Sequence, residues 1–472
     1  MTEVRTRPHP IASVSDVVAY IDSRPAIKGR ALAIWWLALG GLFLDAYANS
    51  ALSAGLASLN EDLGLAAGQT ALLTASASVF SLLFNPIGGW LADRYGRIPP
   101  LIAAKILALA GAAVAAFAPS FEIVVAGRVL VGAAYGIDFA IAMAVLAEMT
   151  PARFKNRLNV WQGVWYTAVS ANLLLAIAFH RLGAGLDIWR FSLGSAGVIA
   201  AALLVLQLAL MVESPSWLAR KGRLPEAAER MGRIYGGNFE AAAAPDTSGV
   251  PDTADRGMAN VALLFRGTYL PRTVLAGTIS VGQALQYFAV GWYLPIISLQ
   301  MFGADFVFAT LGTLVFNLFG IVGGFSAPAV GKRLGLRRAS AIGFGVVFVI
   351  LLAMGLTFDR LPLWAAFLLP SVFILAHSAG PGANGKSVSA LSFRSELRAT
   401  ANGVIGALGS LGTVLGLFLF PLVQEAVGLP ATFLLVSVVP LVCCVICSAV
   451  KWEPTRAAVN PDEELDAPQF AR

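Results

Sequence analysis

Charged residues are scarce in this chain: Asp, Glu, Lys and Arg make up 13% of its 472 residues, against roughly 25% in a soluble domain. Apolar residues make up 57%, and they occur in long runs. Such a chain has too few polar side chains to cover a globular surface, which argues against a soluble protein. The sequence therefore predicts a protein that is embedded in a lipid bilayer.

Histidine and cysteine, which commonly bind metals or carry redox chemistry, are rare. There are three of each, and the cysteines lie together in one apolar run, at Cys443, Cys444 and Cys447. Cys444 and Cys447 have the spacing of a redox pair, but no histidine or acidic residue is near them. We interpret them as small packing residues and predict neither a metal site nor a cofactor.

Other classes of function lack their usual signals. The net charge of +6 is not gathered into a basic stripe with stacking aromatic residues, so no nucleic acid partner is expected. Residues 212–271, the longest polar interruption, contain no catalytic constellation, so no enzyme is expected. We also expect no glycine-rich phosphate loop followed by Lys-Ser or Lys-Thr, and therefore no ATP-driven pump. The first apolar run is too long for a signal peptide and lacks a small-residue cleavage site before its end, so no cleavable signal peptide is expected.

Twelve apolar stretches are long enough to cross a bilayer, for which about 20 residues suffice. They predict an all-α membrane protein with twelve transmembrane helices in two six-helix halves. The expected spans are 31–58, 69–91, 99–118, 122–149, 158–180 and 189–211, then 272–299, 305–330, 339–357, 361–390, 399–421 and 430–450.

Lysine and arginine collect in alternate turns between these spans, whereas the opposite loops hold only Arg181, Arg190 and Arg360. Basic residues favour the cytoplasmic side, so both termini are expected there, in a plasma (bacterial inner) membrane. The expected parts are a cytoplasmic segment 1–30, a first half 31–211, a central loop 212–271, a second half 272–450 and a tail 451–472. The loop is expected to begin as an interfacial helix and to continue as a flexible linker.

A short basic turn recurs half a chain apart, which indicates two related halves. Residues 89–97 read Gly-Trp-Leu-Ala-Asp-Arg-Tyr-Gly-Arg, and residues 332–338 read Lys-Arg-Leu-Gly-Leu-Arg-Arg. Duplicated membrane halves are typical of carriers that rock about a central site, so we predict a transporter. The first turn is expected to close a cytoplasmic gate through charge contacts of Asp93, Arg94, Arg97, Glu148 and Arg153.

Residues 89–97 resemble the signature turn of the major facilitator superfamily. Four further segments resemble its branch of sugar porters and metabolite:proton symporters, at 20–25, 127–132, 146–153 and 213–218. The resemblance implies the major facilitator fold and secondary transport. The chain departs from this branch at Leu391, where an acidic residue is usual, and it lacks the glutamine pair of sugar porters in the seventh span, which argues against a hexose.

Two acidic residues, Asp45 and Asp138, lie near the middle of expected spans, where an ionisable group costs about 2.5–3.5 kcal/mol. Burial disfavours a charged carboxylate, so these groups are predicted to bind and release the coupling proton, as related symporters with acids at these places suggest. The alternative is that one of them only pairs with a helix dipole or a hydroxyl group.

Two cations are candidates for an ion pair with an acid or with the substrate. Arg128 precedes Asp138 by ten residues, and it is expected to pair with Asp45 or another acid, or to hold an anion. Lys386 either reaches the inner surface or faces an anionic substrate. His377, in the same span, is expected to be a packed, hydrogen-bonded residue.

Aromatic and amide side chains on two helical faces predict a substrate pocket. The candidates are Trp161, Gln162 and Trp165 in the fifth span and Gln283, Gln286 and Tyr287 in the seventh. Trp292 and Tyr293 are instead expected to anchor the seventh span at the edge of the membrane.

The favoured function is proton-coupled symport of a small organic metabolite, more specifically a carboxylate-type anion. The expected partners are the small-molecule substrate, protons and the lipid bilayer, and the protein is expected to be a monomer. A sugar or polyol carrier, a drug or metabolite exporter and a non-transporting nutrient receptor remain as alternatives. The receptor is disfavoured because the chain has no large cytoplasmic extension.

Overall fold

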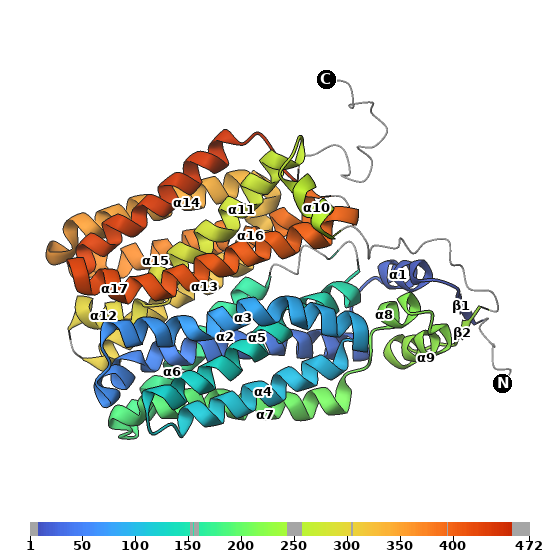
Figure 1. Cartoon of the computed structure of the whole chain (residues 1–472), viewed down its shortest axis with the longest axis horizontal. Coiled ribbons are helices and arrows are strands. Elements are labelled where there is room, and N and C mark those ends of the chain that lie inside the picture. The colour runs from blue at the N-terminus through green and yellow to red at the C-terminus, as the bar shows by residue number, and fades with distance from the viewer. Residues whose placement is uncertain are drawn as a thin grey trace.

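The computed structural model describes residues 8–151, 154, 160–242, 257–303, 305–393 and 395–455. Its helices form two groups that lie side by side along their length (Figure 1). The first group contains the long helices α2 to α7. The second contains α10 to α17, and α12 lies at the end of this group that approaches α2 and α6.

The first half consists of six long helices. They are α2 (Gly29–Leu63), α3 (Ala67–Tyr95), α4 (Ile98–Ala116), α5 (Phe121–Met149), α6 (Trp161–Arg181) and α7 (Ile188–Leu210), with a short turn η2 (Gly185–Asp187) before α7. Glycine allows α3 and α5 to pack closely, because a Cβ atom at Gly132 would overlap the backbone of Ala77.

The second half contains more interruptions. Its elements are α10 (Gly257–Leu264), α11 (Tyr269–Gln286), the π-helical turn η3 (Tyr287–Gly291), α12 (Leu294–Phe302), α13 (Phe306–Leu334), α14 (Leu336–Thr357), η4 (Phe358–Arg360), α15 (Leu363–Ala379), α16 (Pro381–Ser392) and α17 (Ser395–Ala449). The break between α15 and α16 lies at Gly380, where the following Pro381 has no N–H to continue the hydrogen-bond ladder.

The long helix α17 accounts for two of the expected spans. Its backbone leaves the helical region at Gly428, with φ 79° and ψ 166°, so α17 is two helices joined at a kink. Eleven helices of the described residues are long and apolar enough to cross a membrane, and counting α17 as two gives twelve. The predicted fold class is therefore confirmed.

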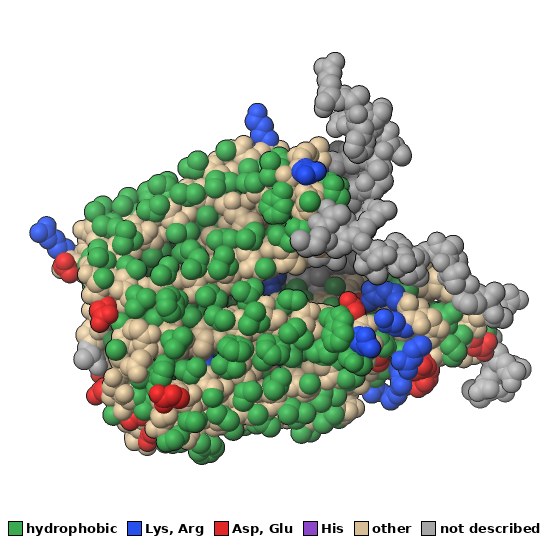
Figure 2. Space-filling view, viewed as in Figure 1, with side chains coloured by type: hydrophobic (Ala, Val, Ile, Leu, Met, Phe, Trp, Pro, Cys, Tyr) green, Lys and Arg blue, Asp and Glu red, His purple; other side chains and the backbone are tan. Residues whose placement is uncertain are grey.

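The outer surface of the bundle is apolar. Hydrophobic side chains cover most of the face shown in Figure 2, and charged side chains gather toward its two ends. Val198, Leu208 and Val322 are more than 60% exposed, although they are large and apolar. Such exposure suits contact with lipid and would be costly in water.

A small folded unit covers one end of the first half. It consists of β1 (His9–Ile11), α1 (Val14–Ser23), α8 (Pro215–Arg220), α9 (Leu224–Tyr235) and β2 (Phe239–Ala241), and β1 pairs with β2 in parallel. Leu224, Ala227 and Met231 of α9 are buried against α1 and α8. The expected interfacial helix is therefore wrong, because protein covers the apolar face of α9. We call this end of the molecule, with the turns at 92–98 and 331–338, the basic end.

Candidate functional site

The two predicted acids meet a lysine that the sequence analysis missed. Lys105 of α4 places its Nζ 2.5 Å from Oδ1 of Asp138 on α5, and each of these side chains is 1% exposed. The carboxyl group of Asp45, on α2, lies in hydrogen-bonding contact with that of Asp138. The signal for Lys105 was present, since it is an ionisable residue within the expected span 99–118.

Helix α2 connects this cluster to the second half. Asp45, Asn49 and Ser53 recur every four residues, so they follow one face that turns by about 40° at each step. Asn49 Oδ1 accepts a hydrogen bond of 2.6 Å from Trp292 Nε1, and Ser53 Oγ donates one of 2.5 Å to the carbonyl oxygen of Trp292. Asp45 therefore lies one helical turn from a contact between the halves.

The predicted ion pair between Arg128 and Asp45 does not form in this structure. Arg128 is 1% exposed, and its Nη1 donates a hydrogen bond of 3.1 Å to the carbonyl oxygen of Ala48 on α2. No ion pair to Arg128 occurs among the residues that the structure describes. Arg128 lies ten residues before Asp138 on α5, so its side chain contacts the α2 backbone and not the acid cluster.

Lys386 projects between the halves. Its ammonium group lies 3.0 Å from the ring centroid of Phe139 and 5.1 Å from that of Trp161, both in the first half. The residue is exposed, and it lies within electrostatic reach of Asp45. A hollow between the halves is visible toward the basic end (Figure 2). Both predicted roles of Lys386, at the inner surface or facing an anionic substrate, stay predictions.

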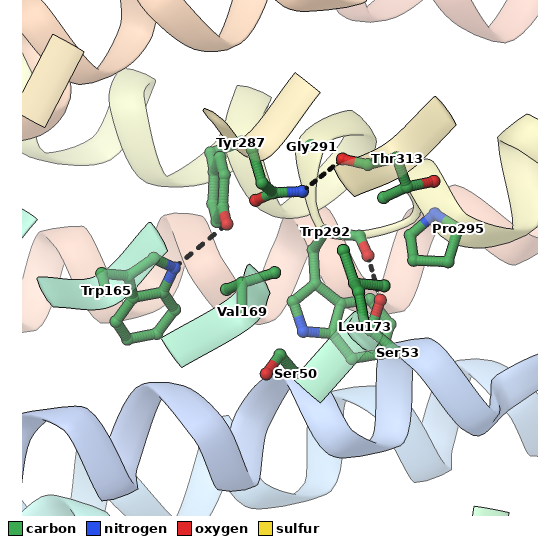
Figure 3. Close-up of a pocket in the computed structure, with 11 residues that line it drawn as sticks. Ser50, Ser53, Trp165, Val169, Leu173, Tyr287, Gly291, Trp292, Pro295 and Thr313 are labelled. Atoms are coloured by element: carbon green, nitrogen blue, oxygen red, sulfur yellow. Dashed lines mark hydrogen bonds between the residues drawn. The ribbon is translucent and has the colours of Figure 1, made fainter. Parts of the chain in front are cut away.

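A small cavity lies where the two halves meet (Figure 3). Its volume is about 10 Å³, enough for about one water molecule. Trp165 Nε1 donates a hydrogen bond of 3.0 Å to the hydroxyl of Tyr287 across the junction. The cavity is lined by Ser50, Ser53, Trp165, Val169 and Leu173 from the first half and by Tyr287, Gly291, Trp292, Pro295, Thr313 and Asn317 from the second.

Two of the six predicted pocket residues, Trp165 and Tyr287, line this cavity. The other four lie around it or deeper in the protein. Trp161 packs edge-on against Phe139, Gln162 is 4% exposed, and Gln283 bonds to the carbonyl oxygen of Ser280. Gln286 is fully buried and lies 3.3 Å from Nδ1 of His377, whose ring stacks on Tyr287. His377 is thus packed and hydrogen-bonded, as expected.

The expected position of Trp292 and Tyr293 at the membrane edge is wrong. Trp292 is 4% exposed and Tyr293 is 2% exposed. The hydroxyl oxygen of Tyr293 lies 2.9 Å from Thr74 Oγ1 and 2.7 Å from the carbonyl oxygen of Leu417, within hydrogen-bonding distance of both. The π-helical turn η3 precedes both residues and shifts the faces of the segment, which turns these rings inward. They join the halves at the end opposite the basic end.

Part of the predicted gate forms a network at the basic end. Arg97 Nη1 lies 2.9 Å from Asp93 Oδ1, and its Nη2 lies 2.8 Å from Glu148 Oε1. Burial opposes the charge of Arg97, but Glu148 and Asp93 outweigh burial and raise its pKa. Arg220 of α8, which was not predicted, also binds Glu148, at 2.7 Å. Arg97 therefore stays charged throughout the working pH range.

The other two predicted gate residues lie outside this network. Arg94 lies over the rings of Trp90 and Tyr95, at 5.5 and 5.7 Å from their centroids. Arg153 falls outside the described residues. The whole network lies within the first half and α8, and a role in gating stays a prediction.

Each of the two basic turns is bound by a carboxylate in the same way, a feature that the sequence did not lead us to predict. Glu213 accepts hydrogen bonds from the backbone N–H groups of Arg97 and Ile98, at 2.7 and 3.2 Å. Glu453 accepts from Leu336 and Arg337, at 2.9 and 3.1 Å. Each carboxylate thus caps the N-terminus of a helix, α4 or α14, where unpaired N–H groups favour negative charge.

The sequence matches a known family over most of its length. The family described as "Sugar (and other) transporter" matches residues 26–452. This chain belongs to that family. The transporter is thus a major facilitator protein, as its predicted resemblance implied, and the prediction of a carrier that is not an enzyme is confirmed.

Relatives of the transporter align along nearly its whole length. The putative metabolite transport protein YaaU of Escherichia coli is 27% identical over 410 residues, which cover 86% of this chain and 88% of the relative. The arabinose-proton symporter of Bacillus subtilis is 24% identical over 438 residues, which cover 90% and 93%.

Solved structures share the fold of the transporter. The proton:xylose symporter XylE, bound to 6-bromo-6-deoxy-D-glucose, aligns with a TM-score of 0.73 and 18% identity, covering 92% of this chain and 98% of that one. The inward open conformation of the xylose transporter XylE from E. coli aligns with a TM-score of 0.74 and 17% identity, covering 92% and 99%.

One sequence pattern in the transporter suggests nucleotide binding, but the fold excludes it. Residues 380–387 read Gly-Pro-Gly-Ala-Asn-Gly-Lys-Ser and match the phosphate-loop pattern, so the expectation that no such pattern is present is wrong. That loop needs a preceding strand and free backbone N–H groups. Here helix α15 precedes the segment and α16 begins at Pro381, so helical hydrogen bonds occupy most of these groups.

Proposed function

We propose that this transporter is a proton-coupled symporter of a small, neutral, polyhydroxylated molecule, a sugar or a polyol. The observation that supports this proposal is the cavity between the halves. Of the described residues that line it, none is charged, and Ser50, Ser53, Thr313 and Asn317 supply hydroxyl and amide groups. Aromatic rings beside such groups suit a molecule that has both hydroxyl groups and apolar C–H faces.

The proposed mechanism is alternating access of the two halves around this cavity. Because both halves contribute its walls, a rocking motion that separates them would widen it from about 10 Å³ to the size of a substrate. The hydrogen bonds of Trp292 and Tyr293 close the end opposite the basic end. With the basic end in the cytoplasm, as the basic turns suggest, this arrangement corresponds to an inward-facing state.

Proton coupling is supported by the acids on α2 and α5. Asp45 and Asp138 are buried in contact with each other, and Asp45 lies one turn from Asn49 at the junction of the halves. A change in the charge of Asp45 would thus affect the contacts of α2 with the second half. The arabinose-proton symporter and the proton:xylose symporter, both similar to this chain, are consistent with such coupling.

A small carboxylate is the second candidate substrate, and Lys386 favours it. This cation is exposed between the halves, where an anion could reach it. However, Lys105 and Lys386 balance the charges of Asp45 and Asp138 while Asp45 is ionised, so an anion would meet a net positive charge only after Asp45 has taken up a proton. We favour the neutral substrate because the described residues that line the cavity are uncharged.

Uptake into proteoliposomes tests both parts of this proposal. The purified full-length protein is given labelled sugars, polyols and monocarboxylates, with and without an inward proton gradient. Accumulation of a sugar or polyol only with the gradient is expected. Gradient-driven accumulation of monocarboxylates alone would replace the sugar assignment, and accumulation that ignores the gradient would remove proton coupling.

A further inference from the structure

Lys105 and Asp138 form an ion pair that water does not reach. The Nζ and Oδ1 atoms lie 2.5 Å apart, and each side chain is 1% exposed. Either charge alone would be strongly disfavoured at this depth, so each stabilises the ionised form of the other. This pair joins α4 to α5 at the centre of the first half.

Helix α2 is shaped to lie directly against this ion pair. Gly41 has no side chain, and a Cβ atom at that position would lie 2.7 Å from Asp138 Oδ2 and 3.2 Å from Lys105 Nζ. Asp45 follows one turn later and brings its carboxyl group to Asp138. Three ionisable side chains from three helices therefore meet at one point.

The three groups do not have equal access to a proton. Two carboxyl groups in contact share one proton, because two adjacent negative charges repel. Lys105 neutralises Asp138 directly, whereas Asp45 has no ion pair among the described residues. Asp45 is also the more exposed of the two acids, at 8% against 1%. The remaining charged or titratable groups near Asp45 are Lys386 from α16 and Tyr135 from α5.

We infer that Lys105 is a positioning residue, which holds Asp138 ionised so that Asp45 carries the transported proton. The proton binds to a carboxylate oxygen of Asp45, forms a hydrogen bond to the Asp138 carboxylate, and leaves to water when the cavity opens on the other side. This inference rests on the proposed proton coupling and decides which acid performs it.

Infrared titration of the purified protein tests the inference without any substrate. The carbonyl stretch of a protonated carboxylic acid is followed against pH in the parent and in Asp45→Asn, Asp138→Asn and Lys105→Met. The band is expected to disappear in Asp45→Asn. In Lys105→Met it should persist to a pH higher by about one unit or more, because the cation that opposes protonation is gone.

In Asp138→Asn we expect the pH at which the carboxylic acid band disappears to shift in the opposite direction. There Lys105 loses its partner and turns to Asp45, so the band should disappear at lower pH than in the parent. The double variant Lys105→Met/Asp138→Asn removes both charges and should return the midpoint toward the parental value. A purely structural ion pair would predict no shift, or shifts of the same sign, in the two single variants.

The outcomes separate this inference from the proposed function. If the band survives in Asp45→Asn and is lost in Asp138→Asn, the inference is overturned, even where the parent accumulates substrate with a proton gradient. If the infrared shifts follow the expected signs but the parent shows no gradient-driven uptake, the role of Lys105 stands and the coupling proposal fails. Should Lys105→Met not fold, the comparison of the two acid variants still decides.

Discussion

The two halves of this transporter share an architecture but differ in what they bury. The first half encloses Lys105, Asp138, Asp45 and Arg128, each less than 9% exposed. The second half buries the polar side chains of Gln286, Asn317 and His377 and the cation Arg272, and Lys386 stays exposed between the halves. The two halves thus share their helices, but among the described residues the buried acids and their ion pair with Lys105 lie in the first half.

The same contrast appears at the basic end. Glu213 and Glu453 cap α4 and α14 in the same way, but Arg97 binds two carboxylates, whereas Arg337 donates to the backbone carbonyl oxygens of Cys447 and Ser448. The glutamate cap is therefore common to both halves. The ion pairs of Arg97 occur in the first half, where Glu148 also binds Arg220 and so attaches α8. We thus expect proton binding to occur in the first half, and the second half to change its position relative to the first as a consequence.

The largest expected effect is loss of accumulation in Asp45→Asn. The variant should exchange labelled for unlabelled substrate but should only equilibrate it under a proton gradient, because the carrier can no longer take up the proton. His377→Gln is the matched control in the second half, since His377 is also buried and has no acid partner among the described residues. Equal loss of accumulation in both variants would contradict the claim that proton binding belongs to the first half.

A second comparison concerns the stability of the basic turns. Arg97→Gln should lower the free energy of unfolding by about 1.5–3 kcal/mol, because it removes charge-assisted hydrogen bonds to Asp93 and Glu148. Arg337→Gln, which loses only hydrogen bonds to carbonyl oxygens, should cost about 1 kcal/mol. Unfolding in detergent measures both, and a larger loss for Arg337→Gln would reverse the comparison.

A smaller effect is expected from Asp93→Ala. The Asp93 side chain is 76% exposed, so its contact with Arg97 contributes little to stability. If the turn closes the carrier when it faces outward, the variant should favour inward-facing states and slow turnover more than it weakens binding. Labelling of a cysteine introduced at Lys386 reports this equilibrium, and an unchanged labelling rate would argue against the gate.

The smallest effect is expected from Lys386→Gln with a neutral substrate. The change in KM should stay within about threefold, or less than about 1 kcal/mol, because no hydroxyl group needs the cation. Competition by monocarboxylates in the parent, together with its loss in Lys386→Gln, would instead favour the carboxylate alternative. Inhibition of uptake at several external pH values distinguishes the two cases.

The sequence by itself determined the twelve spans, the two halves and the candidate acids. A bilayer forces each long apolar run into a helix, and it makes every internal charge conspicuous, so these features follow from local rules. Asp45, Asp138, Trp165 and Tyr287 could be named on that basis. Lys105 was open to the same reasoning and was overlooked.

Only the tertiary structure decided which side chains meet. Lipid and protein interior are equally apolar, so the apolar pattern of a membrane helix does not reveal which of its faces turns inward. For this reason Trp292 was placed at the membrane edge, although packing turns it toward Asn49. Arg128 was likewise expected to pair with Asp45 or another acid, or to hold an anion, although it bonds to the carbonyl oxygen of Ala48. The pairing of Lys105 with Asp138 likewise depends on how α4 and α5 lie against each other, which the sequence of neither helix specifies alone.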